Sequence, residues 1–238
     1  MALCENKKPI AAATMPDAPN SLSASEPDGA AVPVARKRPK PGERRIQILQ
    51  ALAEMLEQPD ADRITTAALA ARLGVSEAAL YRHFASKAQM FEGLIEFIEH
   101  SVFTLVNQVA ERAQTEASDD TAAATAIPRH AGTMLSMVLQ FAEKNPGMTR
   151  VMVGDALVFE NARLQQRMNQ FFDKLEATLR QSLRPVVEGS GSDTPSVDAQ
   201  VMASALTAFL VGRLHRFARS GFKRLPSEHL DASLALIL

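Results

Sequence analysis

The 238-residue chain has one cysteine, one tyrosine and no tryptophan. Because a single cysteine cannot form an internal disulfide, Cys4 excludes a disulfide-stabilised fold and favours a reducing compartment. Aromatic residues make up only 5% of the chain, whereas alanine, leucine and methionine are frequent. This balance favours helices over sheets, and a hydrophobic content of 46% is enough for a full core.

Signals for membranes, secretion and catalysis are also missing. We find no apolar run of membrane-span length and no leader, so we expect a cytoplasmic protein without a membrane partner. The chain has no phosphate-binding glycine loop, no paired metal ligands and no nucleophile elbow. The histidines show no ligand spacing; they are His83, His100, His130, His215 and His229. We therefore expect no enzyme activity, no metal site and no cofactor.

The net charge of −1 is unevenly distributed. Residues 36–87 hold ten Lys/Arg against six Asp/Glu, whereas residues 88–238 hold fourteen against seventeen. A basic segment on a mildly acidic remainder is typical of a small DNA-reading domain carried by a larger body.

The first 42 residues read as a tail and a basic arm. Residues 1–35 are rich in Ala, Pro, Ser and Asp without an apolar period, which predicts disorder. Arg36, Lys37 and Arg38 open the arm, which its prolines keep extended. The arm is either a solubilising linker or a contact to phosphates or the minor groove, and its position beside the next segment favours the contact.

Helical spacing of apolar residues dominates the rest of the chain, with no alternating run and no hairpin signal. The fold is predicted to be all-α, with about nine helices. The expected helices cover residues 43–57, 66–73, 76–84, 87–109, 127–144, a short turn after Pro146, 161–183, 196–219 and 227–237. Pro128 leaves the start of its helix uncertain, and Pro185 with the following Gly-Ser run predicts a mobile loop.

Residues 43–88, here called the head, contain a helix-turn-helix, and residues 89–238 form the body. A short helix ends at Gly74, and Ser76 caps the next helix. Ser86 and Gln89 form a capping box that starts a long helix. This arrangement predicts insertion of the second helix into the DNA major groove.

The first residues of a recognition helix face base edges, while its flanks meet phosphates. Small side chains let this helix sit deep, and Ala78 could meet a thymine methyl. Tyr81 can donate to a phosphate, and Thr66 starts a helix whose end amides suit one. The candidate DNA contacts are Thr65, Thr66, Ser76, Ala78, Tyr81, Arg82, His83 and Lys87.

Several of these positions have a second interpretation. Tyr81 could be a packing residue, and His83 is either a base or backbone contact or simply solvated. Glu77 is a helix-start charge rather than a cytosine acceptor. The apolar residues between them are better explained as the core of the head; they are Leu69, Leu73, Val75, Leu80 and Phe84.

The segment TTAALAARLGVSEAALYRHFASKAQMF closely resembles the head of TetR-family regulators. The resemblance implies a homodimer on near-palindromic double-stranded DNA, with three head helices and about six body helices. The last two helices, residues 196–219 and the C-terminal one, would form a four-helix dimer bundle. Small residues would let those helices approach closely, although a monomer core explains them nearly as well; they are Ala203, Ala205, Ala208 and Gly212.

Two body segments, FAEKNPGMTRVMVGDALVFENARLQQRMNQFF and LEATLRQSLR, are similar to the nucleoid occlusion branch of that family. This similarity implies a DNA-bound, nucleoid-associated protein that disrupts polymers of the division protein FtsZ. The C-terminal tail of FtsZ would dock between the fourth and fifth helices. The matching positions are Phe97, Met137, Gln140, Lys144 and Asn145. Phe97 is physically either an exposed anchor or core, and the N-terminal extension of about 35 residues departs from the family pattern.

The main alternative is a ligand-responsive transcriptional repressor with an apolar pocket in the body. Its lining could include Met134, Met137, Met152 and Phe159, although methionine at helical spacing is more often core.

Overall fold

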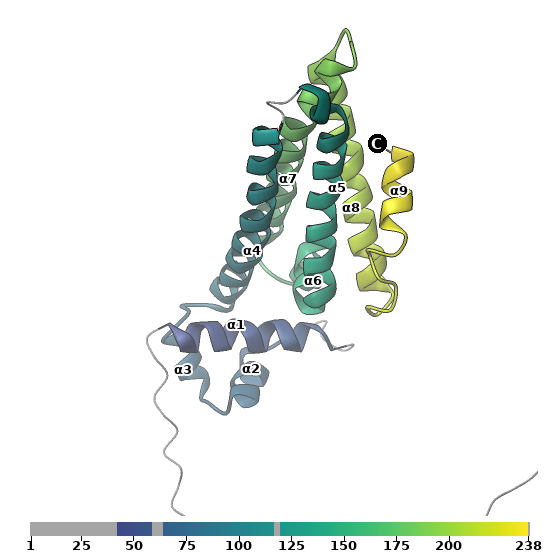
Figure 1. Cartoon of the computed structure of the whole chain (residues 1–238). Coiled ribbons are helices and arrows are strands. Elements are labelled where there is room, and N and C mark those ends of the chain that lie inside the picture. The colour runs from purple at the N-terminus through teal and green to yellow at the C-terminus, as the bar shows by residue number, and fades with distance from the viewer. Residues whose placement is uncertain (1–41, 59–63, 117–119, 238) are drawn as a thin grey trace, which may run out of the picture. The chain divides into compact units, whose positions relative to one another are not determined.

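A computed structural model of the chain describes residues 42–58, 64–116 and 120–237, with the backbone alone for residues 113–116 and 120–128. Cys4 and the basic arm with Arg36, Lys37 and Arg38 lie outside the described residues. Within these ranges the chain forms nine α-helices and one 3₁₀ turn, and no strand (Figure 1). The all-α prediction is confirmed.

Three helices form the head and six the body (Figure 1). The head holds α1 (Glu43–Leu56), α2 (Thr66–Leu73) and α3 (Glu77–Tyr81). The body holds α4 (Lys87–Glu116), α5 (Asp120–Lys144), α6 (Pro146–Met152), the turn η2 (Asp155–Leu157), α7 (Ala162–Gly189), α8 (Pro195–Arg219) and α9 (Leu230–Ile237).

Two proline-based predictions are wrong. Helix α5 begins at Asp120 and runs through Pro128, because the segment TAAATA before the proline is rich in strong helix formers. Helix α7 runs through Pro185 to Gly189, where we expected a loop. Val187 is 5% exposed, and its burial offsets the backbone hydrogen bond that Pro185 cannot donate.

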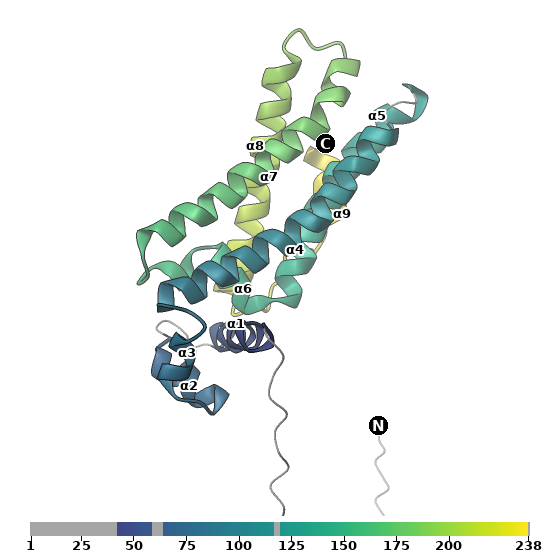
Figure 2. The same ribbon diagram turned by 90° about the vertical axis from the view of Figure 1, so that its left-hand side faces the viewer.

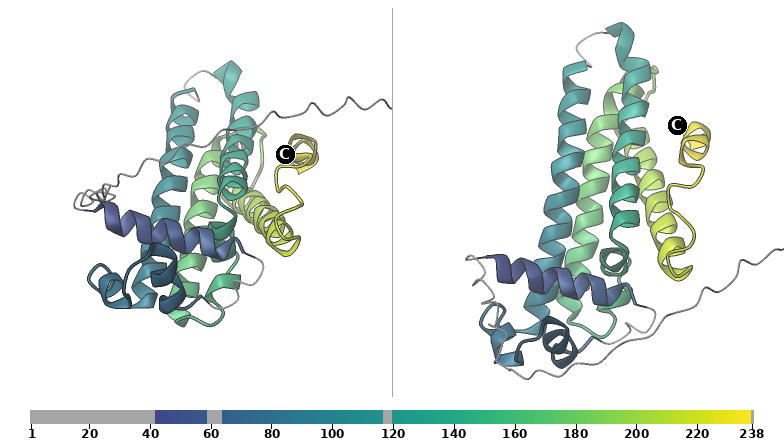
Figure 3. Two further views of the ribbon diagram at one scale, coloured as in Figure 1. Left: turned by 90° about the horizontal axis from the view of Figure 1, so that it is seen from below. Right: turned by 60° about the horizontal axis from the view of Figure 1, so that its bottom comes forward.

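Helix α1 contacts both the helix-turn-helix and the body (Figure 3). Its buried face includes Ile48, Leu52 and Leu56, and it packs on α2, α4 and α6. Helix α1 approaches α6 tightly at Gly147, where a Cβ would lie 1.9 Å from the carbonyl oxygen of Ala53. Only glycine fits there, so this contact fixes how α1 lies on α6.

The body helices run alongside one another, and α4 and α5 are neighbours in both side views (Figures 1 and 2). Helix α7 packs on α8, and α9 packs on α5. By length and composition α8 could cross a membrane, which corrects the expectation that no run reaches that length. In this fold, however, α8 buries one apolar face against its neighbours, with Leu206, Leu210 and Leu214 fully covered.

Candidate nucleic-acid interface and partner groove

Local hydrogen bonds shape the helix-turn-helix as the sequence predicts. The Thr65 hydroxyl accepts from the Ala68 amide at 3.1 Å, and Gly74 ends α2 in the left-handed conformation with φ 63° and ψ 38°. The Ser76 hydroxyl accepts from the Ala79 amide at 3.3 Å. These caps set the start of both helices of the motif.

The capping box at the start of α4 is also confirmed. The Gln89 amide donates to the Ser86 hydroxyl at 3.2 Å, and the Gln89 side-chain oxygen accepts from the Ala85 amide at 2.8 Å. Helix α4 therefore begins within a few residues of the end of α3, and the head continues into the longest helix of the described chain.

A side-chain network joins the first turns of α2 and α3. The Thr66 hydroxyl donates to Glu77 Oε2 at 2.6 Å, and the Tyr81 hydroxyl donates to Thr66 Oγ1 at 3.5 Å. Glu77 therefore acts as a brace between the two helices, a role that neither sequence interpretation included. The eleven-residue separation of Thr66 and Glu77 gives no local signal of this contact.

Most predicted DNA contacts lie on the surface of the head. Tyr81 is 45% exposed, which argues against a pure packing role, and Thr66 is half-buried by its contacts. The exposed candidates are Thr65, Ser76, Ala78, Tyr81, Arg82 and His83. Behind them Leu69, Leu80 and Phe84 are each 1% exposed, and Leu73 and Val75 pack against the same core, as predicted.

Arg45 of α1 braces the end of α3, which sequence reasoning missed. Its Nη1 donates to the carbonyl oxygen of His83 at 3.1 Å, and its guanidinium lies 4.1 Å from the centre of the Phe84 ring. The basic start of α1 thus holds the carboxyl end of the recognition helix in place.

Lys87 does not lie free for a phosphate. Its ammonium group forms an ion pair with Glu160, which closely precedes α7, and the two side chains are only 27% and 12% exposed. In this conformation Lys87 is therefore not available to a phosphate, because the segment between η2 and α7 folds back onto the start of α4; its contact with DNA stays a prediction. To meet DNA, Lys87 would have to leave Glu160 largely buried and unpaired.

The structure exposes Phe97 on α4. Its side chain is 47% exposed, whereas its neighbours Leu94 and Ile98 are at 0%, so the core interpretation is wrong. On the adjacent α5, Gln140 and Lys144 are exposed, and Met137 and Asn145 are half-buried. The Asn145 amide donates to the Phe141 carbonyl oxygen at 2.7 Å, and Gln140 donates to Ser136 Oγ at 3.0 Å.

The four residues proposed for a ligand pocket are either in or against the core, or exposed, as Phe159 is. Met134 and Met152 are core residues at 0% and 2% exposure, and Phe159 is 72% exposed. None of the four residues lines the cavity of about 450 Å³ that lies between α5 and α9. The body thus gives no support to an apolar pocket built from these residues.

Comparison with known proteins identifies the family to which this fold belongs. The family described as "Bacterial regulatory proteins, tetR family" matches residues 48–94, and the "Tetracyclin repressor-like, C-terminal domain" of SlmA-like proteins matches residues 129–238. The TetR-family regulator PfmR of Thermus thermophilus has the same fold, with a TM-score of 0.62 and 21% identity over 81% of this chain and 97% of that one. The regulator FadR of Bacillus subtilis aligns with a TM-score of 0.60 and 14% identity over 81% of this chain and 96% of that one. Fold and head define a DNA-binding helix-turn-helix protein of the TetR class.

Relatives with higher sequence identity identify a family within this class. Nucleoid occlusion factor SlmA of Vibrio cholerae is 48% identical over 82% of this chain and 93% of the relative. The protein of the same name from Photobacterium profundum is 49% identical over 79% of this chain and 90% of the relative. The chain belongs to the SlmA family of nucleoid occlusion factors.

Proposed function

We propose that this nucleoid occlusion factor binds near-palindromic chromosomal sites as a homodimer and, from there, binds the C-terminal tail of FtsZ and disrupts FtsZ polymers. It would act in the cytoplasm, associated with the nucleoid. Family membership supports the division role, and the observation that carries the partner site is the exposure of Phe97 on a helix whose neighbouring apolar residues are buried.

DNA binding is assigned to the head, residues 43–88, with the basic arm of residues 36–42 adding phosphate contacts. The exposed front of α3 carries small side chains, which suits close approach to base edges. Thr66 and Tyr81, fixed by Glu77, are suited to donate to phosphates on either side of the groove. The body, residues 89–238, holds the dimer and partner surfaces.

Self-association is assigned to α8. Val197 and Val201 are 59% and 61% exposed, and Ala205, Ala208 and Gly212 are exposed at the following helical turns. This spacing forms an apolar stripe along one face, and its small residues allow close approach of a second helix. A two-fold pairing of such faces would present two heads to successive turns of the major groove.

FtsZ binding is assigned to the surface between α4 and α5. Phe97 supplies an aromatic anchor, the kind of residue that contributes most to protein–protein affinity. Lys144, exposed at the end of α5, supplies a positive charge for an acidic peptide. Met137, Gln140 and Asn145 would complete the groove.

Phe97→Ala tests this assignment. We expect the variant to keep its DNA affinity and its unfolding temperature but to lose binding of a fluorescent FtsZ tail peptide by at least about tenfold, as for an interface hot spot. Phe159→Ala is the matched control, because Phe159 is 72% exposed on a different part of the body. Equal loss in both variants, or a loss of stability in Phe97→Ala alone, would remove Phe97 from the partner site.

A further inference from the structure

The outer face of α5 extends the proposed partner groove beyond Gln140. A set of residues spaced by three or four positions shares this face and is called here the α5 stripe; it consists of Arg129, Thr133, Ser136, Gln140 and Lys144. Arg129, Gln140 and Lys144 are exposed, and the other two are half-buried. The Gln140 side-chain amide donates to Ser136 Oγ at 3.0 Å, so Gln140 lies along the stripe. The stripe therefore connects the part of α5 already assigned to FtsZ with an earlier part of the helix.

The earlier part of the stripe opens into the cavity of about 450 Å³ between α5 and α9. Arg129, Thr133 and Ser136 line this cavity from α5, and Asp231 and Ala235 line it from α9. Helix α5 has α4 on one side and α9 on the other (Figures 1 and 3). The partner groove and the cavity thus lie along the same face of one helix.

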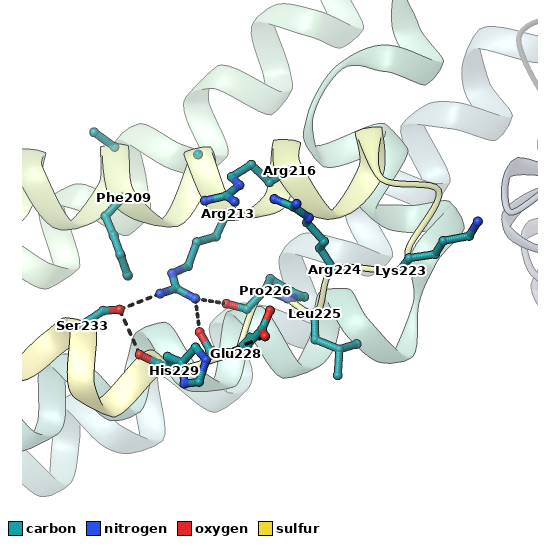
Figure 4. Close-up of a pocket in the computed structure, with 12 residues that line it drawn as sticks. Phe209, Arg213, Arg216, Lys223, Arg224, Leu225, Pro226, Glu228, His229 and Ser233 are labelled. Carbon is teal, nitrogen blue, oxygen red and sulfur yellow. Dashed lines mark hydrogen bonds and ion pairs between the residues drawn. The ribbon is translucent and has the colours of Figure 1, made fainter.

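A second copy paired through α8 would leave this cavity open. His229 and Ser233 line a different cavity on the side of α9 that faces α8, whereas Asp231 and Ala235 lie on the side that faces α5. Arg213 of α8 holds the first side, because its Nη2 donates to Ser233 Oγ at 2.7 Å (Figure 4). Contacts that continue from α8 onto α9 would therefore cover the side with His229 and Ser233.

The α5 stripe carries a cation at each end, Arg129 and Lys144, and uncharged side chains between them. Glu143, which precedes Lys144, accepts from the Ser227 amide at 2.9 Å and is thus held toward the loop before α9. Asp231 lines the opposite wall of the cavity, yet among the described residues Arg129 forms no ion pair. The two ends of the stripe therefore suit a peptide with an acidic residue near each of its own ends.

We propose that the FtsZ tail runs along the α5 stripe from Lys144 to Arg129, so that the partner site includes the cavity between α5 and α9. This inference rests on the proposed function, whose groove supplies the first end of the path. Fifteen residues separate the two cations. They span about 22 Å of helix, which an extended peptide covers with about seven residues. The tail would bring a carboxylate to Arg129 and a side chain into the cavity.

Anisotropy titration of the full chain with a fluorescent FtsZ tail peptide tests this path. Arg129→Gln should weaken binding about threefold, as for one exposed ion pair. Ala235→Trp should weaken it at least about tenfold, because the indole fills the cavity. The matched controls are Arg163→Gln, at an exposed arginine of α7, and Ala232→Trp, at an exposed position of α9 that lines neither cavity. Both controls should bind the peptide as wild type does, and all four variants should keep their unfolding temperature.

Changes in the peptide give a second measurement of the pairing at Arg129. Each acidic residue of the peptide is replaced in turn by its amide. One of these replacements should weaken binding to wild type but not to Arg129→Gln, because the two changes remove the same interaction. A peptide shortened below about seven residues should bind wild type and Arg129→Gln alike, since it no longer reaches the second cation.

Failure of this path is distinguishable from failure of the proposed function. If wild type binds no tail peptide, the assignment of FtsZ binding is wrong and the path falls with it. If Phe97→Ala loses the peptide while Arg129→Gln and Ala235→Trp bind as wild type does, the tail is confined to the groove between α4 and α5, and the extension is overturned. Equal losses in Ala235→Trp and Ala232→Trp, with Arg129→Gln unchanged, would show a general effect on α9 and also overturn it.

Discussion

The head and the body expose their functional side chains by different means. In the head, the hydroxyls of Thr65, Ser76 and Ser86 each cap a helix start by accepting from the backbone amide three residues further along the chain. In the body, the exposure of Phe97 depends on how α4 packs among other helices. The Lys87–Glu160 pair, which joins the head to the body, links residues 73 positions apart. The helix starts of the DNA-reading motif are therefore encoded locally, whereas the partner surface emerges from the tertiary fold.

The largest effect on stability is expected from changing the contact between head and body at Gly147, where α6 meets α1. Gly147→Ala places a Cβ 1.9 Å from the Ala53 carbonyl oxygen, so α6 and α1 must move apart. We expect a loss of about 3 kcal/mol in the free energy of unfolding, measured by urea denaturation, and a parallel loss of DNA affinity. Gly189→Ala is the control, because no atom lies within 4 Å of that added Cβ. Unchanged stability in Gly147→Ala would mean that α1 does not rest on α6.

The next largest effect is expected from removing Glu77, which braces α2 against α3 within the head. Glu77→Ala removes the acceptor of the Thr66 hydroxyl and frees Thr66 and Tyr81 to turn away from the DNA phosphates that we propose they contact. We expect DNA affinity, measured by fluorescence anisotropy, to fall about tenfold, the size of one lost charge-assisted hydrogen bond. Glu54→Ala serves as the comparison, since it loses only an exposed ion pair with Arg72 and should leave DNA binding intact. If the two variants bind alike, Glu77 does not position the DNA contacts.

The smallest effect is expected from breaking the Lys87–Glu160 ion pair between head and body, and it should raise DNA affinity rather than lower it. Glu160→Gln releases Lys87 from its partner, so that a phosphate can take the ammonium group without breaking a largely buried pair. We expect DNA affinity to rise several-fold, with a plot of log affinity against log salt steeper by about one, as for one added phosphate contact.

A second variant separates the two roles of Lys87. Lys87→Met in the Glu160→Gln background should cancel the gain in affinity and the steeper salt dependence. A gain that survives this second change would show that Lys87 does not reach the DNA.

Sequence reasoning succeeded where the cause is local and failed where it is distant. The turn at Gly74 and the caps follow from residue types within one helical turn, so they could be predicted. The availability of Lys87 could not, because its acidic partner lies 73 residues away. The loop expected after Pro185 was wrong because burial of Val187 against the body continues the helix.

The site on the body could be predicted only in part. The helical spacing around Phe97 placed it beside a buried stripe, which left core and anchor equally possible, and its 47% exposure decided between them. The apolar character of α8 has the same ambiguity. Its buried leucines and its exposed stripe of Val197 and Val201 together raise its hydropathy to that of a membrane span. The distinction requires the tertiary structure.

The central claim is that a DNA-bound head places an FtsZ-binding body on the chromosome. Sedimentation of FtsZ polymers with this protein, with and without a duplex carrying its selected site, tests it most directly. The account predicts that polymer is lost from the pellet in the presence of the specific duplex and far less with a scrambled one. Intact polymer despite tight DNA binding would contradict it.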